Sequence, residues 1–436
     1  MEQLEGSFEA YVESIERKFA GPGIAKIVPP KGWTPRKKGY AKVDIQIPQP
    51  IKQLATGSRG LYRLLLVQGK AQSLAKDFRP MATDKDNAPP CTDSREELER
   101  HYWRNLTLRP PHYGADIEGS LFDRGLKGWN LRHLDSLLTR TLKKKKISLP
   151  GCNTPMLYFG MWRSTFAWHT EDVDLASVNY LHYGAPKAWY CIPPEHRERF
   201  ERMLKGILPD LFRSCPEFMR HKELMVSPEF LRLHSIPVVK VMQYPGEFIL
   251  NAPGAYHAGF NCGYNCAESV NFATKRWIIT GAVAEPCRCN EDSIQIDMSM
   301  FLDAASGKAR QAILDAQGES SSDSDSEDEG EDSDDESGAA SHSESGNAQR
   351  KAGRPGAKGK AKLTTSGSRT MAQAAESSSS SPAAQTTSRK RGRPAEDVST
   401  ETSAKRLAAA AARAERAQAR ASSAASEGRR AIYFLN

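Results

Sequence analysis

Apolar and polar positions repeat along the first two thirds of the chain with two different periods. In Ser7–Lys18 large apolar side chains recur every three or four residues behind a cap-like serine, which predicts an amphipathic helix. Similar spacing predicts helices over Glu96–Asn105 and Asn130–Lys143, and Glu195–Lys205 is typical of a charged helix. From Pro155 onward the pattern changes to the short runs that are typical of strands.

Two strand–turn–strand units lie in this second part. Ser177–Tyr183 and Lys187–Ile192 flank a Gly-Ala-Pro turn, and Val238–Tyr244 and Glu247–Asn251 flank a Pro-Gly turn. Many short strands separated by glycine and proline predict a barrel or a jelly roll. We therefore expect a mainly β fold to which helices are added.

The composition changes abruptly near residue 304. All seven tryptophans lie before this point, whereas the residues after it are mostly Ser, Asp, Glu, Ala, Lys and Arg. Such a segment cannot bury enough apolar surface to offset its chain entropy. We expect a folded body over residues 7–303 and a disordered tail over residues 304–436.

Three parts of the tail have candidate roles. Ser320–Ser337 places serines among carboxylates, which suits either acid-directed kinases or a solvating spacer. The sequence RGRP at 391–394 and the weaker GRP at 353–355 resemble an AT-hook core, whose arginines enter a narrow A/T minor groove of DNA. The same basic clusters also fit nuclear localisation signals, so both interpretations predict a nuclear protein. Leu407–Ala419 predicts a lone, transient helix.

Bulk properties narrow the class of protein. The formal net charge of +8 favours an anionic partner. No charged start precedes an apolar core, and no apolar run approaches the roughly 20 residues that span a bilayer. We therefore expect a soluble, intracellular protein with no membrane partner. In that setting the eight cysteines are free thiols or metal ligands rather than a disulfide framework.

The segment from Phe166 to Asp172 contains the candidate chemistry. His169 and Glu171 are two residues apart, so in a strand both side chains project from the same face. His257, at the end of a later strand, supplies a second imidazole. Two histidines and one carboxylate leave three coordination positions open, which suits ferrous iron that must also bind a cosubstrate and O₂. Taken alone the pattern is weak, because a histidine among aromatic residues is more often a hydrogen-bonded core residue.

The neighbouring residues are far more specific. A resemblance to the JmjC domain of the jumonji histone lysine demethylases extends over two blocks, YFGMWRSTFAWHTEDVDLASVNYLHYGAPKAWYCIPPEHRERFERM and GEFILNAPGAYHAGFNCGYNCAESVNFATKRW. Upstream, SFEAYVESIERKFAGPGIAKIVPPKGW resembles the JmjN element that accompanies JmjC in one subfamily. The resemblance implies a double-stranded β-helix, a cupin-like jelly roll, with a helical JmjN element. It also implies an iron(II)- and 2-oxoglutarate-dependent demethylase. The implied substrates are trimethylated and dimethylated lysine nine and lysine thirty-six of histone H3, in the histone tail or in the nucleosome.

The resemblance assigns roles to further residues. 2-Oxoglutarate chelates the iron and places its second carboxylate against Lys187 and Tyr113, with an amide contact from Asn179 and with Phe166 and Trp189 as walls. The sequence around Lys187, taken alone, leaves a second interpretation open, in which it is a solvated surface lysine.

A methylammonium pocket lined by oxygen atoms is also implied, at Gly151, Tyr158, Glu171, Ser269 and Asn271. Two positions depart from the subfamily pattern. Val270 stands where many relatives have a small hydroxyl residue, and Met156 replaces a tyrosine. We expect these departures to affect the preferred lysine and methylation state, and not the chemistry.

A second metal site is predicted from four other residues. Cys215, His221, Cys287 and Cys289 provide three sulfurs and one imidazole, a sufficient set for structural zinc(II). Their spacings match no common zinc finger, so spacing alone favours separate thiols. The resemblance implies a zinc site of three cysteines and one histidine at these positions.

These observations divide the chain into five parts: a JmjN element at 7–48, a mixed linker and helical region at 49–122, a JmjC catalytic domain at 123–286, a segment with zinc ligands at 287–303 and the tail at 304–436. Only Met1–Gly6 precede the first helix, where JmjN elements have an extra strand, and we find no PHD or Tudor-like region. We therefore interpret the chain as a short form.

Two rival functions stay open beside the demethylase. One is a JmjC hydroxylase of a non-histone side chain. The other is a catalytically silent chromatin adaptor, which predicts a damaged metal triad or a lost 2-oxoglutarate anchor, and the sequence has neither.

Overall fold

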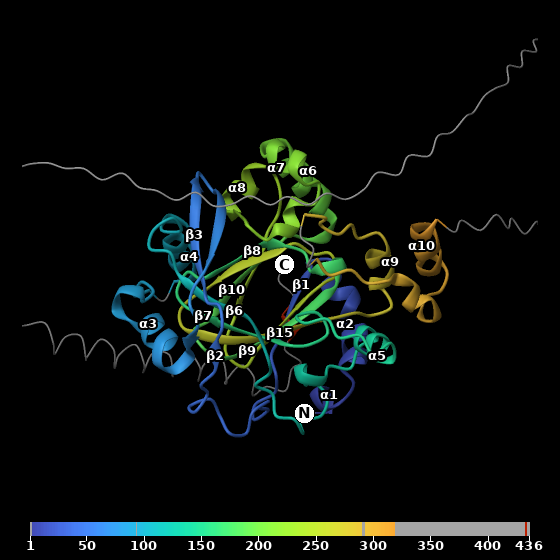
Figure 1. The fold of residues 1–436 in the computed structure, drawn as a ribbon, viewed down its shortest axis with the longest axis horizontal. Helices are drawn as coiled ribbons and strands as arrows, with labels where there is room; N and C mark the ends of the chain where they lie inside the picture. The colour runs from blue at the N-terminus through green and yellow to red at the C-terminus, as the bar shows by residue number, and fades with distance from the viewer. Residues whose placement is uncertain (1, 93, 290–292, 319–431, 434–436) are drawn as a thin grey trace, which may run out of the picture. The chain divides into compact units, whose positions relative to one another are not determined.

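The computed structural model describes residues 2–92, 94–289, 293–318 and 432–433, and Figure 1 shows how they are arranged. Most strands belong to one ten-stranded sheet, in the order β11 (Leu224–Val226), β4 (Leu61–Gln68), β3 (Ile51–Ser58), β6 (His112–Glu118), β7 (Met156–Gly160), β15 (Asn265–Phe272), β9 (Ala176–Gly184), β13 (Phe248–Asn251), β1 (Ile24–Ile27) and β16 (Ile432–Tyr433). A four-stranded sheet has the order β12 (Val239–Gln243), β10 (Lys187–Cys191), β14 (His257–Asn261) and β8 (Thr165–His169). A small third sheet pairs β2 (Gln46–Ile47) with β5 (Gln72–Ser73).

The two large sheets face each other, as a jelly roll requires. The amide of Gln243 in the smaller sheet donates to Asn179 in the larger sheet at 3.2 Å and accepts from the Trp189 indole at 2.9 Å. All the pairings within both sheets are antiparallel. The predicted mainly β, jelly-roll fold with helices is confirmed.

Helices surround the sheets. The α-helices are α1 (Glu2–Glu5), α2 (Phe8–Ala20), α3 (Arg79–Thr83), α4 (Arg95–Arg104), α5 (Leu137–Lys144), α6 (Arg197–Ile207), α7 (Pro209–Ser214), α8 (Pro228–Leu233), α9 (Trp277–Ala282) and α10 (Lys308–Gln317). Shorter turns of helix are η1 (Leu74–Phe78), η2 (Lys85–Asn87), η3 (Leu131–His133), η4 (Asp172–Asp174), η5 (Pro194–His196), η6 (Phe218–His221) and η7 (Met298–Ala304). Among the described residues, every helix is too short or too polar to span a bilayer.

The N-terminal helix α2 is built into the body of the protein. Its predicted cap is present, because the Ser7 hydroxyl accepts a hydrogen bond from the Ala10 N–H at 3.2 Å. Phe8 is fully buried and meets Trp129 and Phe272 edge-on, at ring distances of 4.9 and 5.0 Å. Phe272 belongs to β15, so α2 packs on the face of the large sheet that points away from the smaller sheet.

The prediction of one helix over Asn130–Lys143 is wrong. The structure has a single turn, η3, that ends at His133, and α5 begins only at Leu137. Between them Ser136 is extended, and its hydroxyl accepts from the Thr139 N–H. A serine that caps a helix in this way stops the helix from continuing through it.

The region 49–122, which we expected to be a mixed linker and helical segment, contains η1, α3, η2 and α4 and is also part of the large sheet. It contributes β3, β4 and β6 to the large sheet. The hairpin of β3 and β4 turns at Arg59 and Gly60, which both have positive φ, as in the tight turns that suit the twist of a hairpin. Leu64–Val67 is a continuous apolar run. It therefore lacks the alternation of apolar and polar residues that usually predicts a strand.

The expectation that disorder begins at residue 304 is wrong for its first residues. Helix α10 continues the folded body to Gln317, and its Ile313 is fully buried in a cluster that includes Trp277 and Phe301. One buried isoleucine on a short helix is enough to hold it when a pocket of aromatic side chains receives it. The acidic run, the AT-hook-like sequences and the helix predicted at Leu407–Ala419 lie outside the described residues.

We predict that Phe8→Ala lowers the free energy of unfolding by about 3–5 kcal/mol, because the change leaves a cavity between α2, Trp129 and Phe272. The control is Glu13→Ala on the exposed face of the same helix, which should change stability by less than about 0.5 kcal/mol. Urea unfolding of both variants measures the difference. Equal stability of the two would contradict the packing described here.

Candidate functional site

The pairing of β8 with β14 brings the two predicted histidines together. His169 is the last residue of β8 and His257 the first of β14, and the two are direct partners across the antiparallel ladder. Their ring centroids are 4.3 Å apart. Glu171, two residues beyond the end of β8, has an Oε1 atom 3.4 Å from Nε2 of His257. The three side chains each offer a ligand atom within 4.8 Å of the others.

Backbone carbonyls orient both imidazoles. Nδ1 of His169 lies 2.7 Å from the Ala167 carbonyl oxygen, and Nδ1 of His257 lies 3.0 Å from that of Ala255. Because a carbonyl only accepts, each Nδ1 is the atom that donates to it, and each Nε2 is turned toward the common centre. Burial, with His257 close by, lowers the pKa of His169 to about 3, so its imidazole is neutral, as a metal ligand must be.

The carboxylate is ionised although it is enclosed. Burial by itself raises the pKa of Glu171, but its hydrogen bond with His257 and the nearby positive charge of Lys222 more than offset this, and its pKa lies below the ordinary value. One carboxylate oxygen and two imidazole nitrogens form the donor set of a two-histidine, one-carboxylate iron site. The residues present therefore fit ferrous iron.

Lys187 lies in the same cavity and has no acidic partner among the described residues. It is only 3% exposed, donates to the Tyr113 hydroxyl at 3.0 Å, and lies 4.6 Å above the Phe166 ring. Burial lowers its pKa to about 7. A buried amine without a counter-ion is costly, so this position calls for a bound anion. The alternative of a solvated surface lysine is excluded by its burial.

The other predicted cosubstrate residues surround this amine. Phe166 and Trp189 meet edge-on at 4.7 Å, and both line the cavity together with Asn179. Gln243 was missed at the sequence level, yet it orients two of them: it donates to the Asn179 Oδ1 and accepts from the Trp189 indole. The Asn179 NH₂ group is thereby left for a ligand. A fully buried glutamine in a strand gives no sequence signal of its own.

The cavity has a volume of about 390 Å³ and contains the predicted substrate residues as well. Its lining includes Gly151, Tyr158, Glu171, Ser269 and Asn271. Strand alternation explains this for β15, since Ser269 and Asn271 lie on the inner face. Val270 lies on the opposite face, buried in the core that α2 covers, so the expectation that it alters the pocket is wrong. Met156, the second departure, does line the cavity.

Several lining residues had no sequence signal. Gln53 of β3 ties the hairpin to β8, because its amide donates to the Thr165 carbonyl at 2.7 Å and accepts from the Thr165 N–H at 2.8 Å. Lys222 lines the cavity from a left-handed residue at the end of η6, and its Nζ lies 3.7 Å from Asp172. Only the fold brings these two residues to the site.

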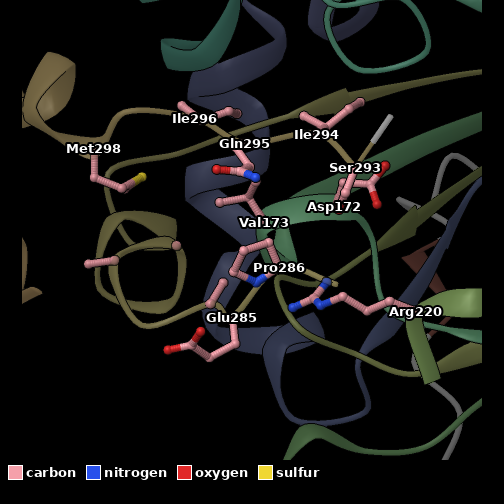
Figure 2. Close-up of a pocket in the computed structure, with 13 residues that line it drawn as sticks. Asp172, Val173, Arg220, Glu285, Pro286, Ser293, Ile294, Gln295, Ile296 and Met298 are labelled. Carbon is pink, nitrogen blue, oxygen red and sulfur yellow. The ribbon is translucent and has the colours of Figure 1, made fainter. Parts of the chain in front are cut away.

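A second cavity of about 180 Å³ adjoins the first and shares Asp172 and Ile294 with it (Figure 2). Arg220 enters it from η6, and its guanidinium pairs with Asp174 at 3.2 Å and donates to the Glu171 carbonyl at 3.3 Å. The segment that carries Arg220 therefore holds the backbone of an iron-ligand candidate.

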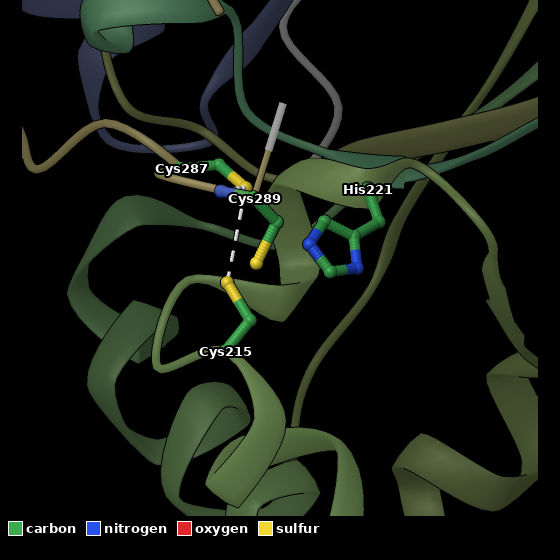
Figure 3. A group of neighbouring side chains, drawn as sticks. All are labelled: Cys215, His221, Cys287 and Cys289. Carbon is green, nitrogen blue, oxygen red and sulfur yellow. Dashed lines mark hydrogen bonds between the residues drawn. The ribbon is translucent and has the colours of Figure 1, made fainter. Parts of the chain in front are cut away.

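The four residues of the predicted second metal site come together beside this segment (Figure 3). Cys215 follows α7, His221 ends η6, and Cys287 and Cys289 follow α9. The Sγ atoms of Cys215 and Cys287 are 3.8 Å apart, and ligand atoms of all four lie within 4.8 Å of one another. Three thiols and one imidazole at this separation fit a closed, tetrahedral zinc site.

Comparison with known proteins agrees with this geometry. Residues 156–272 match the family model described as "JmjC domain, hydroxylase". Over 296 residues, 68% of the chain, the sequence is 46% identical to lysine-specific demethylase 4B of Mus musculus, 43% to probable lysine-specific demethylase 4F of Homo sapiens and 42% to lysine-specific demethylase 4D of Rattus norvegicus. The aligned part spans 27%, 46% and 58% of these relatives. The matched residues contain His169, Glu171 and His257, and the chain thus contains a JmjC domain.

Proposed function

We propose that this protein is an iron(II)- and 2-oxoglutarate-dependent demethylase of trimethyl- and dimethyl-lysine in histone H3, at lysine nine, lysine thirty-six or both. The observation that carries the proposal is the buried Lys187, which faces the cavity of the iron-ligand candidates without an acidic partner among the described residues. A dicarboxylate that also binds iron supplies the missing charge. The three relatives, each named as a lysine-specific demethylase, support the same choice.

His169, Glu171 and His257 hold the iron through two Nε2 atoms and one carboxylate oxygen. When bound, iron, O₂ and 2-oxoglutarate supply the hydroxylation of an N-methyl group, and the products are succinate, CO₂, formaldehyde and the demethylated amine. Lys187 and Tyr113 bind the second carboxylate of 2-oxoglutarate, and the Asn179 amide adds a hydrogen bond. The protein thus contributes position and charge to the reaction.

The substrate cation is held by oxygen atoms. The Asn271 NH₂ donates to the Ala176 carbonyl at 3.3 Å, so its Oδ1 is available to the cavity. The Ser269 hydroxyl donates to the Val178 carbonyl at 3.1 Å, so its lone pairs are available too. Burial raises the pKa of Tyr158 well above its ordinary value and keeps that hydroxyl neutral. Such oxygens favour the polarised C–H bonds of a methylammonium group.

We further propose that Cys215, His221, Cys287 and Cys289 bind one zinc ion and that the protein works in the nucleus. A zinc ion there fixes η6, which carries Arg220 and precedes Lys222, beside the iron site. The basic sequences of the tail suit nuclear import or contact with DNA.

Lys187→Met should abolish demethylation at limiting 2-oxoglutarate and raise KM for 2-oxoglutarate by at least about a hundredfold, because it deletes the buried amine that binds the second carboxylate. The matched control is Lys240→Met, which removes an exposed lysine from the neighbouring strand β12. Mass spectrometry of trimethylated H3 peptides, incubated with iron and ascorbate, measures demethylation as a loss of ~14 Da for each methyl group removed. A gain of one oxygen without methyl loss favours the hydroxylase, and peptide binding without turnover favours the adaptor.

Affinity for the cosubstrate should depend on pH through Lys187. Below about pH 7 the amine is already protonated, so affinity is constant; above it, binding must take up a proton, and affinity falls by up to about tenfold per pH unit. Calorimetry with N-oxalylglycine and nickel, an unreactive analogue and a redox-silent metal, in buffers of different ionisation enthalpy measures the proton uptake. A flat affinity and no proton uptake up to about pH 8.5 would contradict this prediction.

Cys215→Ser should lose about one zinc ion per chain and lower the thermal midpoint by about 5 °C or more. Elemental analysis and thermal denaturation measure the two effects. The matched control is Cys91→Ser, because Cys91 is an exposed thiol outside the cluster. Equal metal content in both variants would rule out the zinc site.

A further inference from the structure

Helix α5 ends in a run of consecutive lysines, Lys143–Lys146, which we call the lysine turn. All of these side chains are exposed, and none has an acidic partner among the described residues. On the same helix Arg140 pairs with both Glu9 and Asp135, at 2.5 and 2.8 Å, so these two carboxylates are already engaged. Like charges this close along a helix repel one another. The lysine turn is therefore a concentrated positive charge without a counter-ion in the described part of the protein.

The backbone holds the lysine turn in one conformation. The Ile147 N–H donates to the Leu142 carbonyl at 2.9 Å, and the two side chains share a hydrophobic cluster. The Lys146 N–H donates to the Lys143 carbonyl at 3.0 Å, which completes a Schellman motif. Lys146 is the left-handed residue of this motif, with a φ of 58°, where glycine is free of strain and lysine is not. Attraction to the helix C-terminus explains a cation at Lys143, but folding favours glycine at position 146.

The lysine turn is fixed beside the cavity of the iron-ligand candidates. Gly151 lines that cavity and follows Lys146 by five residues, so their Cα atoms lie within about 18 Å of each other. Asn153 holds the loop between them. Its side-chain oxygen accepts from the Leu149 N–H at 2.7 Å, and its NH₂ donates to the Ile147 carbonyl at 3.3 Å. A partner of the lysine turn is therefore bound next to the cavity.

Further cations lie near the lysine turn. Burial, together with the charges of Arg132, Arg124 and Lys143, lowers the pKa of His133, so these cations surround one imidazole. Arg124 is exposed and, like the lysines, has no acidic partner among the described residues. The segment Leu137–Gly151 contains no aromatic residue. This surface thus offers point charges without the aromatic stacking partners that single-stranded nucleic acids require.

We propose that the lysine turn, together with Arg124, binds the phosphate backbone of double-stranded DNA. A duplex carries about one negative charge per 1.7 Å of its axis, so it meets several lysines at once. Unlike the basic sequences of the tail, this surface belongs to the folded body. Its nucleosomal role rests on the proposed function, because DNA wraps the histones and lies next to a methylated H3 lysine that enters the cavity. Contacts to phosphate position the enzyme and read no DNA sequence.

The test uses the full chain and a labelled duplex of about thirty base pairs, with binding followed by fluorescence anisotropy over a salt series. The test variant combines Lys143→Gln, Lys144→Gln, Lys145→Gln and Lys146→Gly, in which glycine keeps the left-handed cap. It should bind the duplex at least about tenfold more weakly than wild type, and the slope of log K against log salt should fall by about three to four. Arginine at all four positions should retain the affinity. Unchanged binding by the test variant overturns the proposal.

The matched control removes the same charge elsewhere. It replaces by Gln four exposed lysines on β3 and around α3, which lie away from α5 (Figure 1): Lys52, Lys70, Lys76 and Lys85. The control should bind the duplex within about threefold of wild type, since net charge alone acts weakly at a distance in salt. Equal weakening of the test variant and the control overturns the proposal. Equally tight binding of single-stranded RNA, lost to the same extent in the test variant, overturns the choice of duplex DNA.

Lys146→Gly alone separates binding from folding. It should raise the thermal midpoint, because glycine adopts the left-handed conformation without strain. It should also weaken duplex binding and reduce the salt slope by about one, because one phosphate contact is lost. A variant that is more stable but binds less tightly shows that this lysine serves a partner. An unchanged salt slope overturns the role of Lys146, whatever the change in stability.

Demethylation assays distinguish this inference from the proposed function. On nucleosomes with trimethylated H3 the test variant should lose about five- to tenfold in kcat/KM, mostly through KM, and on the free H3 peptide it should equal wild type. Equal losses on both substrates overturn a role in nucleosome binding. If neither substrate is turned over but the test variant still loses duplex affinity, the DNA surface stands and the demethylase proposal fails. If both are turned over but the test variant binds the duplex like wild type, the demethylase stands and this inference fails.

Discussion

The register between β8 and β14 is the constraint on which the site depends. Since His169 and His257 are direct partners across this ladder, a slip of one residue turns one imidazole to the other face and removes it from the metal position. β10, the neighbour of β14, carries Lys187 and Trp189 on the face that His257 also uses, because Cys191 is the partner of His257. One sheet thus fixes the spacing between the two histidines of the candidate iron site and Lys187.

The cavity is built at a cost in stability. Lys187 and Asn179 line the cavity, and the amine loses its hydration without gaining an acidic partner among the described residues. The surrounding structure offsets this cost by rigid packing: α2, Trp129 and Phe272 lock the outer face of the large sheet while its inner face stays polar. A bound anion would offset this cost, because it would bring the negative charge that Lys187 lacks among the described residues.

The sequence allowed the part of the site that lies on regular strands, or directly after one, to be predicted. His169, Glu171, Lys187 and Asn179 sit in runs whose two-residue alternation or family motif marks them, and the structure brings them to one cavity. What could not be predicted depends on contacts across long separations. Gln243 matters only because β12 lies opposite β9, and Gln53 only because the hairpin reaches β8. Helix α10 was missed for a different reason: its single anchoring residue, Ile313, stands in a polar segment.

The two faces of strand β4 in the hairpin have different surroundings. In a strand with one buried face, apolar residues on the solvent face contribute nothing to folding, so Leu65 and Val67 are not explained by the core of this protein. Leu66 differs from them because it lines the cavity that also contains His169, Glu171 and His257. One face of β4 therefore borders the cavity while the other exposes apolar side chains, and among the described residues no strand pairs with the free side of β4 beyond Leu64.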